Sequence, residues 1–98
     1  MPGSQRRKAF TEAARAFNEC AQAAPPELEE EKKVYYKNAG QCFSEGHKLD
    51  EAGECYVKAE EYTLAANTFR KGGHFDEMVE VLRLHGSSID DKDRRAHV

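Results

Sequence analysis

The fold is decided by residues 39–82, which read AGQCFSEGHKLDEAGECYVKAEEYTLAANTFRKGGHFDEMVEVL. Residues of similar kind return along this stretch at intervals of 13. The equivalent sets are Ala39, Ala52, Ala65 and Met78; Cys42, Cys55, Thr68 and Val81; Phe43, Tyr56, Phe69 and Leu82; Gly46, Ala59 and Gly72; and Leu49, Tyr62 and Phe75. A fixed period over so many positions indicates an architecture built from repeated units.

Each unit of this repeat is predicted to form one short helix. Ala52, Tyr56 and Ala59 have the i, i+4, i+7 spacing that places three side chains on one helix face. At a rise of about 1.5 Å per residue, a unit holds roughly ten or eleven helical residues and a tight turn. Two successive units therefore make one antiparallel helix pair. Such short helices are marginal alone in water, so neighbouring helices must cover their small-residue faces.

Glycines and prolines mark the predicted helix ends. Gly46 and Gly72-Gly73 can adopt the left-handed conformation that commonly closes a helix. Pro25-Pro26 ends a first helix upstream, because proline cannot continue one, and Gly86 is predicted to close the last. The predicted helices lie near 5–23, 27–45, 50–59, 62–71 and 75–85, in a single domain over residues 1–86. Residues 87–98 are predicted to be a polar tail or the start of a truncated next helix.

The composition agrees with this pattern. Charged residues make up 34% of the 98 residues, Ala and aromatic residues recur, and the β-branched residues that a sheet needs are few. A chain of this length buries only roughly two thirds of its unfolded surface, so its core must be economical. We therefore predict an all-α fold in which about five helices stack as short antiparallel pairs in an α-solenoid.

Charge, hydropathy and cysteine content exclude several classes of protein. The formal net charge is −3, so the chain lacks the basic field that nonspecific binding to nucleic acid or an anionic membrane needs. No apolar run approaches the roughly 18 to 20 residues of a membrane span, and no signal-peptide core follows Met1. Three cysteines without close spacing fit a reducing compartment. The expected location is intracellular, cytoplasmic or nuclear.

Neither metal binding nor catalysis is indicated. The cysteines and histidines lack the Cys-x-x-Cys or His-x-x-x-His spacing that brings two side chains to one ion. Cys42 and Cys55 instead occupy core positions of the repeat, as small apolar residues do. The sequence also has no glycine-rich phosphate loop and no Gly-x-Ser-x-Gly motif. We predict a protein that is not an enzyme and that needs no metal and no cofactor.

The repeated residues resemble the tetratricopeptide repeat (TPR) motif, in which small and aromatic residues mark two antiparallel helices. The matching positions are Ala39, Gly40 and Phe43 in the first helix, Leu49 at the turn, Ala52, Tyr56 and Ala59 in the second helix, and a second copy at Ala65, Ala66, Phe69, Phe75, Met78 and Leu82. Ala13, Phe17, Cys20 and Pro25 match an orphan second helix upstream. The repeat lacks the first Trp of the motif, and its helix pair spans two intervals of 13, which is shorter than the roughly 34 residues of a TPR.

Within this class, the chain is similar to the helical arrays of TPR and ankyrin repeat-containing proteins that also carry a helicase-like region. This resemblance implies a fragment of a large protein, and whether residues 1–4 are an added leader stays open. The pattern Ala-x-x-Cys-Tyr-x-Lys-Ala over residues 52–59 is also similar to intraflagellar transport and SNAP-type solenoids. The parent protein therefore stays open.

The resemblance to TPR proteins implies a binding surface on the concave wall that the first helix of each pair provides. The positions of this wall that packing does not use are Lys37, Gln41, Ser44, Thr63, Asn67 and Arg70. All six are polar, which suits an extended or helical peptide, and the cations among them favour acidic groups in that peptide. We predict a non-catalytic interaction or scaffolding module that binds a protein or peptide. The alternative for these residues is that they are ordinary solvent-facing side chains.

Two other functions stay open. The first is that of a structural spacer within a larger solenoid. The chain is expected to be a monomer or to self-associate through exposed repeat ends. A third alternative is accessory binding of nucleic acid by Arg6-Arg7-Lys8 and Lys92-Asp93-Arg94-Arg95. Both basic clusters are terminal, aspartates dilute the second, and neither has an aromatic stacking surface beside it. Nucleic acid is therefore the least favoured partner.

Overall fold

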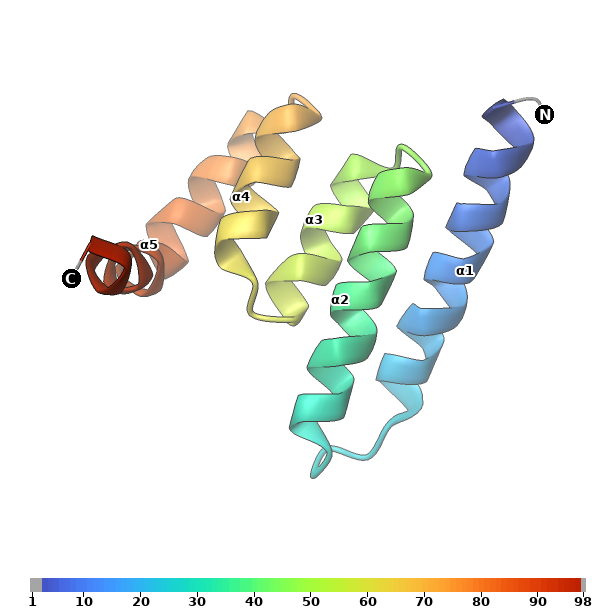
Figure 1. The fold of residues 1–98 in the computed structure, drawn as a ribbon, viewed down its shortest axis with the longest axis horizontal. Helices are drawn as coiled ribbons and strands as arrows, with labels where there is room; N and C mark the ends of the chain where they lie inside the picture. Colours follow the sequence, from blue (N-terminus) through green and yellow to red (C-terminus); the bar gives the residue numbers. More distant parts are fainter. Residues whose placement is uncertain (1–2, 98) are drawn as a thin grey trace.

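The chain folds into five helices that pack in sequence order. The computed structural model describes the backbone of residues 3–97 and the side chains of residues 5–86. The elements are α1 (Gly3–Ala23), α2 (Glu29–Glu45), α3 (Leu49–Lys58), α4 (Tyr62–Lys71) and α5 (Phe75–His97), with no strand between residues 3 and 97. Successive helices run antiparallel, and each packs mainly on its neighbours along the chain (Figure 1). The predicted all-α fold is confirmed.

The turns that join α2 to α5 repeat one geometry at the same interval as the sequence pattern. His47 has φ 62°, Glu60 has φ 59° and Gly73 has φ 78°, so the residue that follows each helix cap is left-handed. In the first turn the Lys48 N–H donates to the Phe43 carbonyl at 2.8 Å. The equivalent bonds in the other turns run from Glu61 to Tyr56 at 2.9 Å and from His74 to Phe69 at 2.8 Å. This hydrogen bond satisfies a carbonyl of the last helical turn.

The predicted role of Gly46 in this geometry is wrong, and the structure gives the reason. Its φ is −82°, and the left-handed residue is the following His47. A Cβ at Gly46 would lie 2.6 Å from Oγ1 of Thr11 and 3.1 Å from the Arg7 carbonyl oxygen. Gly46 is therefore required because the turn after α2 packs directly on α1. At Gly73 the prediction holds, because that residue is left-handed.

Glycines inside the helices allow close packing of neighbours. A Cβ at Gly40 in α2 would lie 2.9 Å from the Tyr56 ring of α3, and a Cβ at Gly53 in α3 would overlap the Phe69 ring of α4. Both aromatic residues stand 16 positions after their glycine, so one contact recurs in successive units. The register of the stack is thus set by an aromatic ring that rests on a residue without a side chain.

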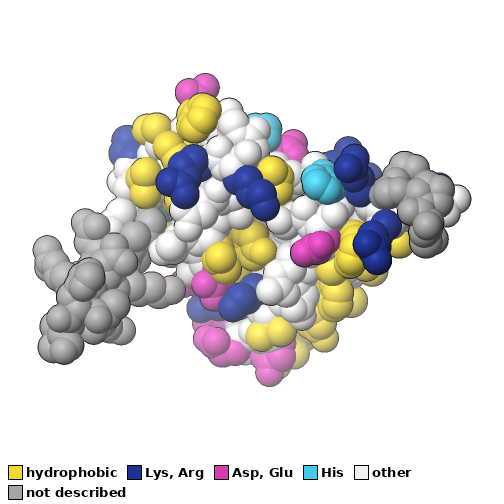
Figure 2. All heavy atoms as spheres, turned by 45° about the horizontal axis from the view of Figure 1, so that its top comes forward, with side chains coloured by type: hydrophobic (Ala, Val, Ile, Leu, Met, Phe, Trp, Pro, Cys, Tyr) yellow, Lys and Arg dark blue, Asp and Glu magenta, His cyan; other side chains and the backbone are white. Residues whose placement is uncertain are grey.

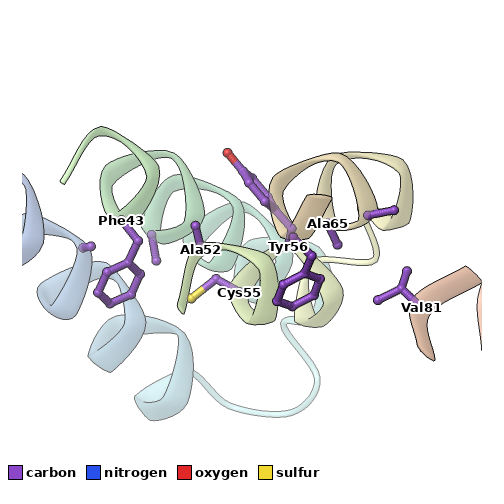
Figure 3. Packing of buried hydrophobic residues seen from close by; sticks show 10 residues of the cluster. Phe43, Ala52, Cys55, Tyr56, Ala65 and Val81 are labelled. Atoms are coloured by element: carbon purple, nitrogen blue, oxygen red, sulfur yellow. The ribbon is translucent and has the colours of Figure 1, made fainter. Parts of the chain in front are cut away.

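The core is a narrow layer of small and aromatic side chains between the helices. Its buried members are Ala14, Ala39, Phe43, Ala52, Cys55, Tyr56, Ala65, Ala66, Phe69 and Val81. Figure 3 shows side chains of this cluster following one another from Phe43 of α2 to Val81 of α5. Most of the cluster comes from the equivalent sets of the sequence, which confirms that the period marks the buried face.

The predicted end of the last helix is wrong. The sequence predicts a stop near Gly86, whereas helix α5 runs from Phe75 to His97. The reason is that Gly86 lies outside the left-handed region, unlike the residue that closes α4. The ribbon of α5 changes direction toward its C-terminal end (Figure 1). The other helix bounds agree with the prediction within two residues.

Candidate partner-binding surface

The six predicted binding residues lie at equivalent places on two helices. Lys37, Gln41 and Ser44 belong to α2, and Thr63, Asn67 and Arg70 occupy the equivalent positions of α4, two units further along the chain. Gln41, Thr63, Asn67 and Arg70 are exposed, whereas Lys37 and Ser44 are half-buried. None of the six belongs to the core, so all of them retain polar surface for a partner.

The structure brings two of these residues into one hollow. Gln41 and Ser44 line a depression of about 660 Å³ together with Phe10 of α1 and Tyr56 of α3. Cys42 and Glu45 complete its wall. The three residues on α4 do not belong to this lining. We call the three residues on α2 and the three on α4 the two polar patches, and only the patch on α2 borders this hollow.

Lys37 is already engaged by an ion pair. Its Nζ lies 3.5 Å from Oε2 of Glu61, at the turn between α3 and α4. Lys33, one helical turn earlier on α2, makes the same kind of contact with Glu60 at 3.1 Å, and the hydrogen bond that it donates to Glu60 raises the pKa of Lys33. Both pairs are solvent-accessible, so water screens them and each contributes little to stability. Their main consequence is that an acidic ligand at Lys37 would compete with Glu61 for the same ammonium group.

Arg70 stands in a different electrostatic setting. It ends α4 next to Lys71, and both side chains are exposed. Neither residue takes part in an ion pair among the described side chains. Cations in the last turn of a helix also face the negative end of its dipole. A carboxylate of a ligand could therefore bind Arg70 and Lys71 without first displacing a carboxylate of the protein.

An apolar groove between α3 and α5 has no counterpart among the sequence-based predictions. Its volume is about 300 Å³, and its apolar wall is formed by Val57, Phe69, Val81 and Leu84. Charged side chains at its rim include Glu54, Lys58, Glu77 and Glu80. One feature of the sequence could have indicated this groove: Val57 and Leu84 are apolar although they lie outside the repeating sets. Val57 and Leu84 come together because α3 and α5 lie on the same side of α4. The 13-residue period alone does not predict this arrangement.

The cysteines are free thiols in three different environments. Cys20 is exposed, Cys42 is half-buried and Cys55 is buried in the core. Burial raises the pKa of the Cys55 thiol to about 11 and also raises that of Cys42. A thiol with such a pKa is protonated at neutral pH and is a poor nucleophile. Within residues 5–86, no group of three or more His, Cys, Asp or Glu side chains is arranged to hold a metal ion.

Two sequence-based predictions concern the ends of the chain. Arg6, Arg7 and Lys8 are exposed in the first turns of α1. The side chains of the second basic cluster, residues 92–95, lie outside the described part of the chain. Among the described residues, no helix is both long enough and apolar enough to cross a membrane.

Comparison with known proteins does not place the chain in a family. No family model, no curated protein and no solved structure matches the sequence. The class of protein that the fold defines is an all-helical domain of five sequentially packed helices.

Proposed function

We propose that this chain is a non-catalytic, TPR-like repeat module that binds a peptide segment of a partner protein on the α2 and α4 surfaces. The observation that supports this proposal most is the repetition of one turn geometry, with left-handed residues 13 positions apart at His47, Glu60 and Gly73. A chain that repeats its turns presents equivalent faces on alternate helices. Solenoids use such faces as extended binding surfaces.

The chemistry of the two patches suggests how the peptide is held. Amide and hydroxyl groups of Gln41, Thr63 and Asn67 can exchange hydrogen bonds with a peptide backbone. Arg70 and Lys71 favour a carboxylate at one end of the peptide, because neither is engaged in an ion pair among the described residues. Lys37, which is held by Glu61, contributes less to binding an acidic group. The similarity to a TPR and ankyrin repeat protein with a helicase-like region stays a narrower prediction about the parent protein.

Peptide selection followed by charge reversal tests this proposal. A peptide selected from a random library against the folded chain is expected to be enriched in Asp and Glu. Arg70→Glu should weaken its binding about tenfold or more, since a close ion pair becomes a repulsion. The matched control is Arg83→Glu on α5, which reverses the same charge away from both patches and should change binding less than about twofold. If Arg70→Glu behaves like the control while circular dichroism is unchanged, the assignment to α4 is wrong.

A structural spacer is the second candidate, and a specific observation favours it. Phe75, Val79 and Leu82 form an i, i+4, i+7 row on α5 and are 57%, 54% and 44% exposed. Rows at equivalent positions of α3 and α4 are largely covered by other helices. Concentration-dependent association in sedimentation experiments, abolished by Leu82→Glu, would favour this function. A chain that remains monomeric at millimolar concentration would count against it.

A further inference from the structure

A basic hollow lies between α1 and the turn that follows α2. Its volume is about 490 Å³, and its lining includes four permanent cations, Arg7, Lys8, Arg15 and Lys48. His47 also faces it, and Glu12 is the only carboxylate in the lining. On the α1 side of the molecule, Lys and Arg side chains gather beside a His (Figure 2). This concentration of positive charge occurs in a chain whose formal net charge is −3.

The cations of the hollow are not neutralised within the described protein. None of the four takes part in an ion pair among the described side chains. Elsewhere, cations such as Lys33, Lys37 and Arg83 do have carboxylate partners within 4 Å. Like charges held close together repel one another, and a multiply charged anion between them removes that repulsion. The hollow is therefore electrostatically complementary to an anion.

Packing between α1 and the turn brings the backbone segments that carry these cations together. Gly46 approaches α1 so closely that a Cβ would lie 2.6 Å from Oγ1 of Thr11. Thr11 is buried, and its hydroxyl donates a hydrogen bond of 2.9 Å to the Arg7 carbonyl. Arg7, Thr11 and Arg15 follow one another at i, i+4, i+8 on one face of α1. The close approach of Gly46 brings the turn that carries Lys48 against this face of α1, and a larger residue at position 46 would prevent it.

We propose that this hollow binds the phosphate group of a phosphorylated serine or threonine in a partner peptide. A phosphate monoester carries a charge of about −1.5 to −2 at neutral pH and three acceptor oxygens, which suits converging arginines and lysines. The proposal goes beyond the α2 and α4 surfaces, because it uses different residues and a different ligand group. Failure of one proposal leaves the other standing.

The lining favours a phosphopeptide over the other anionic macromolecules. It contains no Phe, Tyr or Trp, and its one ring is the imidazole of His47, so it offers no row of aromatic side chains on which successive bases could stack. The hollow is also a local depression, whereas a nucleic acid strand or a lipid surface needs a basic field that extends beyond it. The acidic balance of the whole chain opposes such an extended field.

Binding is measured by titrating the isotope-labelled chain, observed by NMR, with three probes at constant ionic strength. The probes are inorganic phosphate, a Gly/Ala-flanked phosphoserine peptide and the same peptide without phosphate. Saturable shifts of the Thr11, Gly46 and Lys48 amides are expected with both phosphate compounds. The phosphopeptide should bind at least about tenfold more tightly than its unmodified form. Equal binding of the two peptides, or no saturable shift, overturns the proposal.

Three variants separate a site from general charge effects. Arg15→Gln combined with Lys48→Gln should weaken phosphopeptide binding about tenfold or more, and Lys32→Gln combined with Arg83→Gln should leave it unchanged. Glu12→Gln removes the one opposing carboxylate and should strengthen binding roughly threefold, a gain that misfolding cannot imitate. Unchanged affinity in Glu12→Gln overturns the proposal. Tighter binding of single-stranded DNA or of vesicles with anionic lipid at these amides would also overturn it, in favour of those ligands.

Discussion

Phe69 of α4 and Leu82 of α5 occupy equivalent positions of the repeat, yet only the first is buried. Phe69 is 3% exposed and Leu82 is 44% exposed. The Phe69 ring lies over Gly53 of α3 and shares its cluster with Val81 of α5, so helices cover it from both sides. No described helix follows α5. The repeating pattern therefore determines which face of a helix is apolar, whereas burial of that face requires a following helix.

Truncating the two equivalent side chains should give the largest contrast. Phe69→Ala is expected to lower the free energy of unfolding by about 3–5 kcal/mol, because it opens a cavity in the core. Leu82→Ala should cost less than about 1 kcal/mol, because an exposed side chain loses little buried area. Urea titrations followed by circular dichroism measure both values. Equal losses would show that α5 is covered as fully as α4.

Adding a methyl group to two helical glycines sharpens the same contrast. Gly53→Ala places a Cβ into the Phe69 ring and should cost about 1–3 kcal/mol despite the better helix propensity of alanine. Gly86→Ala meets nothing within 4 Å, and its φ suits any residue. That change should stabilise the chain by roughly 0.5–1 kcal/mol. Thermal unfolding of the two variants should therefore shift in opposite directions, and a shared direction would contradict the packing described for Gly53.

The loss of stability at alkaline pH should distinguish the buried thiol of Cys55 from the half-buried thiol of Cys42, which occupies the equivalent position of the repeat. Burial raises the pKa of Cys55 from 9.0 to about 11, so above pH 9 the unfolded chain loses a proton that the folded chain keeps. Stability therefore falls as the pH rises, by about 1 kcal/mol at pH 10 from this group. Cys55→Ala should reduce that slope more than Cys42→Ala does. A slope that neither variant changes would show that another group causes the loss.

The smallest effect is expected at the surface ion pairs of α2. Glu61→Gln removes the partner of Lys37 and should cost less than about 1 kcal/mol, a loss that diminishes in roughly 1 M salt. The same substitution at Glu54, which forms no described ion pair, is the matched control. A cost of several kcal/mol at Glu61 would mean that these pairs hold α2 to the turn after α3.

The parts of the fold that the sequence predicted are those that depend on local pattern. The helices α3 and α4 were found because turns and small-aromatic pairs recur at a fixed interval. The end of α5 was missed because a glycine closes a helix only where the backbone turns left-handed, as at Gly73 and not at Gly86. Gly46 was given the wrong role because its packing on Thr11 joins elements distant in the sequence.

The candidate sites were less predictable, for the same physical reason. The groove between Val57 and Leu84 and the hollow between Arg7 and Lys48 each combine residues from separate helices. A repeat period describes spacing along the chain, so it does not predict which residues of separate helices come together in either site. The six residues taken from the TPR resemblance are accessible, but their use by a partner remains a prediction.

Nuclear Overhauser contacts of the aromatic rings test the sequential stack most directly. In the sequential stack, contacts are expected from the Tyr56 ring to the Gly40 α-protons and from the Phe69 ring to the Gly53 α-protons, repeated one unit apart. No contact is expected between the Phe43 ring and the Val81 methyl groups, which lie far apart in the core (Figure 3). Contacts between Phe43 and Val81 would instead show a closed bundle and would contradict the stack.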